Sequence, residues 1–123
     1  MFEPNAIVLY VDNLTITSAF YQDILGMKPE EASPSFHAFK LSNGMSLGLK
    51  TRETVEPPPT DKNGSGELAF ILDTHEKVND LFAKWQAKGI TIPLPPTLVM
   101  YGYTFLALDP DGNRLRVVAM RKD

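Results

Sequence analysis

Two stretches of this chain share one pattern: A-I-V-L-Y-V-D-N-L-T-I-T-S-A-F-Y-Q-D-I-L-G at residues 6–26, and E-L-A-F-I-L-D-T-H-E-K-V-N-D-L-F-A-K-W-Q-A-K-G at residues 67–89. Each begins as an apolar strand that ends at an aspartate, and continues as an amphipathic helix that ends at a glycine. Such an internal repeat predicts two structurally equivalent modules.

The segments that follow each helix repeat as well. In the first half, strands are predicted at 36–41 and 45–49, with the turn pair Asn43-Gly44 between them. In the second half, strands are predicted at 103–108 and 115–118, around Pro110-Asp111-Gly112.

Helix ends and minor strands complete the expected order. The first helix is predicted to be capped by Asn13 or Thr15 and the second by Thr74. Further short strands are expected around 28–32 and at 90–92, followed by a rigid proline loop at 93–96. The fold class is therefore α+β, a single domain of two βαβββ modules (about 1–56 and 66–123) joined by a Pro/Gly-rich linker at 57–65.

Composition excludes several classes of function. The chain has 123 residues, no cysteine and a net charge of −3, with a pI near 5.3. The absence of cysteine excludes disulfides, thiolate metal sites and cysteine nucleophiles, and the acidic balance argues against a nucleic-acid partner. Without an apolar run of about 20 residues or a basic leader, we expect a cytoplasmic protein that has no membrane partner.

These motifs carry a resemblance to a known family. The pattern V-L-Y-V-D-N-L…A-F-Y-Q-D-I-L-G, together with D-P-D-G-N-R-L-R-V, resembles the vicinal oxygen chelate superfamily, which includes glyoxalase, extradiol dioxygenases, fosfomycin-modifying enzymes and bleomycin-resistance proteins. The resemblance extends from Ala6 to Ala119 and implies paired βαβββ modules whose curved sheets form a cup, in a homodimer. The stretch T-F-L-A-L-D-P-D-G-N-R-L-R-V is most similar to the drug-binding, bleomycin-resistance-like branch.

The resemblance also implies where a metal would be held. In metal-dependent members a His or Glu projects from the start of each module's first strand and from each last strand; here those positions hold Ala6, Gly48, Glu67 and Arg116. A divalent metal needs about three ligands from His, Asp or Glu, and this set has one. A guanidinium ~4 Å from a dication costs on the order of 8 kcal/mol at an effective dielectric of about 20. We therefore expect no metal and no cofactor.

A charge pair is predicted in place of the metal. Because the first and last strands of a module pair in this fold, Glu67 and Arg116 should form an ion pair. Ala6 and Gly48 are small and are expected to leave space for a flat organic ligand. Lys50 and Arg114 share the strand parity of Gly48 and Arg116, so they are expected to reach a ligand carboxylate or phenolate. Aromatic ligand contacts are expected from five residues: Phe36, Phe39, Tyr101, Tyr103 and Phe105.

Three functions remain open on the sequence. The favoured one is a metal-independent, non-enzymatic protein that sequesters a planar aromatic antibiotic, as in bleomycin, phenazine or mitomycin resistance. The second is a lyase or dioxygenase with displaced ligands, or a metal-free enzyme, with His37 or Glu67 as remnant ligand or general base; no serine with a histidine partner is evident. The third is a partner-binding domain. A purely structural role is the alternative for His37, for the Glu67–Arg116 pair and for the strand aromatics.

Overall fold

The computed structural model describes residues 3–56, 58–59 and 67–122. The chain divides into two compact units, Met1–Lys62 and Asn63–Asp123, and each unit is a βαβββ module. The predicted α+β fold of two such modules is confirmed, while the cup formed by both sheets stays a prediction. The predicted linker at 57–65 lies outside the described residues, except for Pro58 and Pro59.

The first module contains a four-stranded sheet in the order β1-β4-β3-β2. Strand β1 is parallel to β4, and the other neighbours are antiparallel. The elements are, in chain order, β1 (Ala6–Val11), α1 (Leu14–Leu25), β2 (Glu31–Ala32), β3 (Phe36–Lys40), β4 (Ser46–Thr51) and the short 3-10 helix η1 (Arg52–Thr54).

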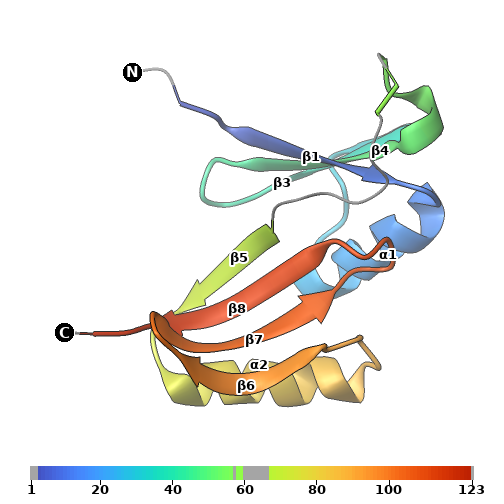
Figure 1. Cartoon of the computed structure of the whole chain (residues 1–123). Coiled ribbons are helices and arrows are strands. Elements are labelled where there is room, and N and C mark those ends of the chain that lie inside the picture. Colours follow the sequence, from blue (N-terminus) through green and yellow to red (C-terminus); the bar gives the residue numbers. More distant parts are fainter. Residues whose placement is uncertain (1–2, 57, 60–66, 123) are drawn as a thin grey trace. The chain divides into compact units, whose positions relative to one another are not determined.

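The second module repeats this topology in the order β5-β8-β7-β6, and β5 is parallel to β8. Figure 1 shows α2 lying along one face of this sheet. The elements are β5 (Glu67–Leu72), α2 (His75–Ala87), β6 (Leu94–Val99), β7 (Gly102–Leu108) and β8 (Arg114–Met120).

Side-chain caps begin both helices, as the sequence predicts. Asn13 accepts a hydrogen bond from the backbone N–H of Ile16 at 3.1 Å, and Thr74 accepts one from Lys77 at 3.1 Å. Of the two caps considered for α1, Asn13 is therefore the one used. The first helix ends at Gly26 with φ 66°, the left-handed conformation expected of a C-terminal glycine.

Strand β6 differs from the prediction. No strand forms at 90–92; the strand instead covers 94–99, where a rigid loop was expected. Its two prolines, Pro95 and Pro96, lie at an irregularity in the pairing with β7, between Leu94 and Thr97. Because β6 is an edge strand, prolines there remove few ladder hydrogen bonds, which is why the sheet accepts them.

Aromatic rings form the core between α2 and its sheet. Trp85 meets Phe70 and Phe105 edge-on, both at 5.6 Å between ring centroids, and Phe82 also contacts Phe105. Side chains alternate between the two faces along each strand. The opposite face, which we call the far face of the second sheet, therefore carries Glu67, Ala69, Ile71, Thr104, Leu106, Arg114, Arg116, Val118 and Met120.

The first sheet is built in the same way. Phe39 and Leu49 are fully buried on the side of His37, which hydrogen-bonds to α1. The far face of the first sheet is the opposite one, and it carries Ala6, Val8, Tyr10, Phe36, Ala38, Gly48 and Lys50. Within the part of the chain that the structure describes, no helix is long and apolar enough to cross a membrane.

The turn before β8 is organised by the carboxylate of Asp109, which is 4% exposed. One oxygen accepts hydrogen bonds from the backbone N–H groups of Asp111 (2.9 Å) and Asn113 (2.8 Å), and the other accepts from the Asn113 amide at 2.9 Å. In the first module, Asn43 holds the equivalent turn through a single exposed bond to Met45 N–H, at 2.9 Å.

We expect Asp109→Ala to lower the free energy of unfolding by about 1–3 kcal/mol, because two part-buried backbone N–H groups and the Asn113 amide lose their acceptor. The matched control Asn43→Ala should cost less than about 1 kcal/mol, since water can replace one exposed bond. Urea unfolding of both variants measures this difference. Equal losses in the two turns would contradict it.

Candidate functional site

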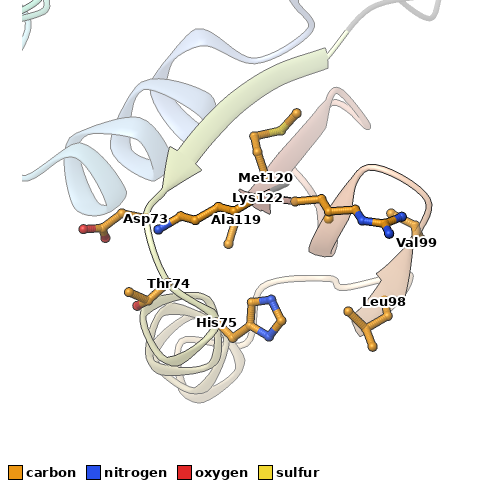
Figure 2. Close-up of a pocket in the computed structure, with 10 residues that line it drawn as sticks. Asp73, Thr74, His75, Leu98, Val99, Ala119, Met120 and Lys122 are labelled. Carbon is orange, nitrogen blue, oxygen red and sulfur yellow. The ribbon is translucent and has the colours of Figure 1, made fainter.

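A cavity of about 620 Å³ lies at one end of the second sheet. It is bordered by the end of β5, the start of α2, the β6–β7 hairpin and the end of β8 (Figure 2). Lys77 donates a hydrogen bond to Asp73 at the rim, at 2.8 Å; this contact lowers the pKa of Asp73 and raises that of Lys77. None of the residues that the sequence analysis placed in a ligand site lines this cavity.

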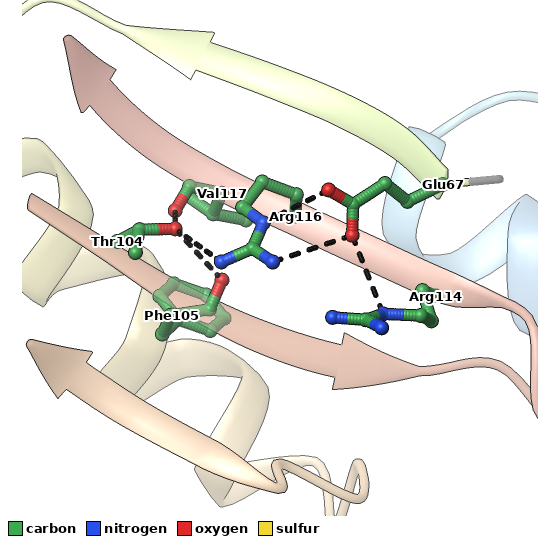
Figure 3. Close-up of polar contacts among 6 residues, drawn as sticks. All are labelled: Glu67, Thr104, Phe105, Arg114, Arg116 and Val117. Atoms are coloured by element: carbon green, nitrogen blue, oxygen red, sulfur yellow. Dashed lines mark hydrogen bonds and ion pairs between the residues drawn. The ribbon is translucent and has the colours of Figure 1, made fainter. Parts of the chain in front are cut away.

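At the other end of β8, the predicted Glu67–Arg116 ion pair is present. The Nε atom of Arg116 lies 3.2 Å from Oε1 of Glu67, and Nη2 lies 3.4 Å from Oε2. Figure 3 shows the guanidinium and the carboxylate facing each other on the far face of the second sheet. This two-point contact fixes the plane of the guanidinium as well as its distance.

A second arginine joins the pair. The parallel register places Glu67 directly opposite Arg114, with Arg116 opposite Ala69. Arg114 Nε lies 3.3 Å from Oε2 of Glu67, so one carboxylate holds two guanidinium groups. The sequence predicts Arg114 on this face but not its contact with Glu67.

Thr104 is a partner that the sequence analysis missed. Its hydroxyl accepts a hydrogen bond from Nη1 of Arg116 at 3.3 Å and donates one to the carbonyl of Val117 at 2.8 Å. Thr104 is fully buried, and the Arg116 side chain is 12% exposed. A mostly buried cation is stable only when its N–H groups are bonded, and Glu67 and Thr104 meet that need.

On the far face of the first sheet, an aromatic ring covers the equivalent position. A Cβ atom built on Gly48 would lie 2.8 Å from Cε1 of Phe36, so the ring is packed directly on the glycine. The prediction that Gly48 leaves open space is therefore wrong: Phe36 fills it. The amine of Lys50 lies 5.9 Å from the centre of the same ring, and Ala6 is exposed at the start of β1.

Four of the predicted aromatic contacts lie elsewhere. Phe39 and Phe105 are fully buried on the helix-facing sides of their sheets, where they complete the two cores. Tyr103 also faces α2: its ring stacks on His75 and its hydroxyl donates to Asn79. Tyr101 lies in the turn between β6 and β7. Phe39, Tyr103 and Phe105 therefore do not share a sheet face with Gly48 or Arg116, because strand parity directs them toward helices, while the ligand contact of Tyr101 stays a prediction.

His37 has a serine partner that the sequence did not reveal. Its Nδ1 atom lies 2.6 Å from the hydroxyl of Ser18 on α1, and that hydroxyl also accepts a hydrogen bond from the Gln22 amide at 3.1 Å. The structural interpretation of His37 is thus the one that the contacts support. Ser18 is 1% exposed, so its oxygen is shielded from any substrate.

The four metal positions implied by the resemblance do not suit a metal ion. They combine Ala6, Gly48 and Arg116 with one carboxylate, Glu67, whose two oxygens already accept from arginines. Among the described residues, no group of three or more His, Asp or Glu side chains is placed to hold one. The side chains at these positions therefore do not supply the donors that a divalent cation needs.

The chain is similar to a known protein family, to a relative by sequence and to solved structures. A family model described as the Glyoxalase/Bleomycin resistance protein/Dioxygenase superfamily matches residues 4–117. The phenazine antibiotic resistance protein EhpR of Enterobacter agglomerans is 30% identical over 117 residues, which cover 93% of this chain and 89% of EhpR. The solution NMR structure of ATC0852 from Agrobacterium tumefaciens is 45% identical, with a TM-score of 0.90 over 99% of this chain and 100% of that one. A glyoxalase-related enzyme from Fulvimarina pelagi, 20% identical with a TM-score of 0.83 over 96% and 88% of the two chains, shares the fold.

We expect Glu67→Ala to reduce the free energy of unfolding by about 1–3 kcal/mol, because it leaves the mostly buried Arg116 without its carboxylate. Arg114→Ala should cost less than about 1 kcal/mol, since that side chain is half exposed and its ion pair is screened by water. Urea unfolding at neutral pH compares the two. A loss in Glu67→Ala no larger than in Arg114→Ala would show that the pair does not stabilise the fold.

Proposed function

Because this chain belongs to the glyoxalase/bleomycin resistance protein/dioxygenase superfamily, we propose that it is a metal-independent binding protein for a planar aromatic small molecule. The observation that carries the proposal is the Glu67–Arg116 pair, which occupies positions where metal-dependent members place ligands. A site so constructed can recognise a ligand by charge and shape without a Lewis acid.

The charge of the cluster indicates what kind of ligand it would take. Two guanidinium groups and one carboxylate give the cluster a net charge of +1. The Arg114 side chain is half exposed, and its contact with Glu67 runs through Nε, so its outer part can donate to a ligand. A carboxylate or phenolate on the ligand would make charge-assisted hydrogen bonds there. We therefore propose an anionic ligand.

The first sheet offers an aromatic contact surface. The ring of Phe36 packs on Gly48, and Lys50 lies near it on the same face. A ring backed by glycine is held in one orientation, and a flat ligand that stacks on it gains about 0.5–1.5 kcal/mol beyond area burial. This surface is proposed as a ligand contact in its own right.

A relative supports the choice of ligand class. EhpR is a phenazine antibiotic resistance protein, and phenazines are planar tricyclic aromatics. An identity of 30% over most of both chains makes a phenazine-like molecule the natural first probe. Under this proposal the chain confers resistance by sequestering the antibiotic.

The enzymatic alternative has less support from the contacts. Glu67 is held by two arginines, which occupy both of its oxygens. His37 uses Nδ1 for its bond to the buried Ser18. Neither residue is placed as a ready general base.

A homodimer belongs to the same proposal. Strand β1 is an edge of its sheet, and three of its large side chains are substantially exposed: Ile7, Val8 and Tyr10. An exposed apolar edge strand is typical of a surface that a second copy covers.

Phenazine-1-carboxylate should bind more tightly than its neutral carboxamide analogue, because only the acid can pair with arginine. Arg114→Ala should weaken binding of the acid by about tenfold, the value of a partly exposed charged hydrogen bond, and leave the amide nearly unchanged. Isothermal titration calorimetry measures both. The matched control is Lys84→Ala, which removes one exposed positive charge on α2. Equal affinity for the acid and the amide would contradict the proposal that the ligand is an anion.

Metal analysis of the purified protein should find far less than one zinc, nickel, manganese or iron per chain. These ions should leave the melting temperature unchanged, whereas a ligand at about 100 times its dissociation constant should add about 2.7 kcal/mol of stability. Mass spectrometry should recover the ligand chemically unchanged after incubation. Stoichiometric metal, or product formation that Glu67→Gln abolishes, would favour the enzymatic alternative.

A further inference from the structure

The cavity at the end of the second sheet is separate from the arginine cluster. Arg114 and Arg116 lie near the start of β8, whereas the cavity is lined by Ala119 and Met120 at its end. We propose that this cavity is a second binding site, which takes a small aromatic carboxylate. The assignment does not depend on what binds at Arg116.

An aromatic surface is already fixed on one side of the cavity. The imidazole of His75 stacks on the ring of Tyr103, with 4.5 Å between centroids and 23° between planes. Tyr103 is itself held by its hydroxyl, which donates to the Asn79 side chain at 2.7 Å. His75 itself lines the cavity, so a planar ring can lie next to its imidazole.

Apolar side chains are exposed around the same space. Leu98 is 70% exposed and Met120 is 48% exposed. In Figure 2, His75 and Leu98 lie on one side of an open space, with Met120 and Lys122 on the other. A ring system next to His75 would cover Leu98, which shares the α2-facing side of the sheet with Tyr103, while Met120 borders the cavity from the end of β8 on the far face.

The charges at the rim favour an anion. Arg121 and Lys122 contribute two positive charges, and the negative charge of Asp73 is offset by its ion pair with Lys77. The backbone N–H of Arg121 donates to the carbonyl of Tyr101 at 2.7 Å, which ties the basic segment to the β6–β7 hairpin. Charge complementarity therefore selects a carboxylate as the polar group of the ligand.

Size limits the ligand further. A volume of about 620 Å³ lies within the range of about 300–1,000 Å³ that is typical of small-molecule pockets. One flat ring system next to His75, with its acid group directed to Arg121, satisfies the apolar and the basic parts of the lining together.

The test uses 2-naphthoate as the probe and the full chain labelled with ¹³C in its methionine methyl groups. Titration should shift the Met120 methyl resonance in a saturable way, and leave the resonance of Met45, in the first module, in place. Arg121→Ala should weaken the apparent affinity about five- to tenfold, in line with an exposed charged contact. The neutral analogue 2-naphthamide should bind correspondingly less well.

Two further variants separate this site from the arginine cluster. Arg114→Ala should leave the naphthoate-induced shift of Met120 unchanged, and Lys84→Ala should do the same as a charge control. The proposal is overturned if Met120 does not respond, if Arg121→Ala binds as the parent does, or if the amide binds as tightly as the acid. It is also overturned if sedimentation shows that a second copy covers Leu98, with Leu98→Asp abolishing that association and naphthoate failing to compete.

Discussion

Parallel pairing of the first and last strands within each module is the constraint on which the candidate site depends. Strand β5 lies in register with β8, so alternate residues of both strands reach the same sheet face. Glu67 and Arg116, 49 positions apart in sequence, meet only because this register holds. A shift by one residue would turn Arg116 toward α2, where its charge would be buried among aromatic rings.

The two modules use the same backbone positions for different chemistry. In the first module the register places Ala6 opposite Ser46 and Val8 opposite Gly48, where the second module has Glu67 opposite Arg114 and Ala69 opposite Arg116. In the first module the Phe36 ring covers Gly48, and in the second module these positions hold a hydrogen-bonded ion cluster. Burying most of an arginine costs free energy, which Glu67 and Thr104 offset by occupying its N–H groups. The repeat thus preserves topology while the side chains on its far faces diverge.

Much of the fold could be predicted because the decisive interactions are local. Asn13 and Thr74 cap helices through backbone groups three positions away, and the Asp109 turn closes within four residues. The prediction for strand β6 was wrong because the position of this strand depends on a long-range feature, the order of strands in the sheet. Prolines disfavour a central strand, and only the sheet order shows that this strand lies at an edge, where they are tolerated.

The sequence by itself determined the repeat, the fold class and the Thr74 cap, because each follows from a short-range pattern. The Glu67–Arg116 pair was predicted from the strand pairing that the family resemblance implies, and the choice between Asn13 and Thr15 as the first cap was left to the structure. Only the tertiary structure decided which way the strand aromatics point, that Arg114 and Thr104 join the ion pair, that Ser18 bonds to His37, and where a cavity opens. These depend on which face of each strand meets a helix and on distances between segments far apart in the chain. Periodicity restricts such choices to two faces, but packing selects between them.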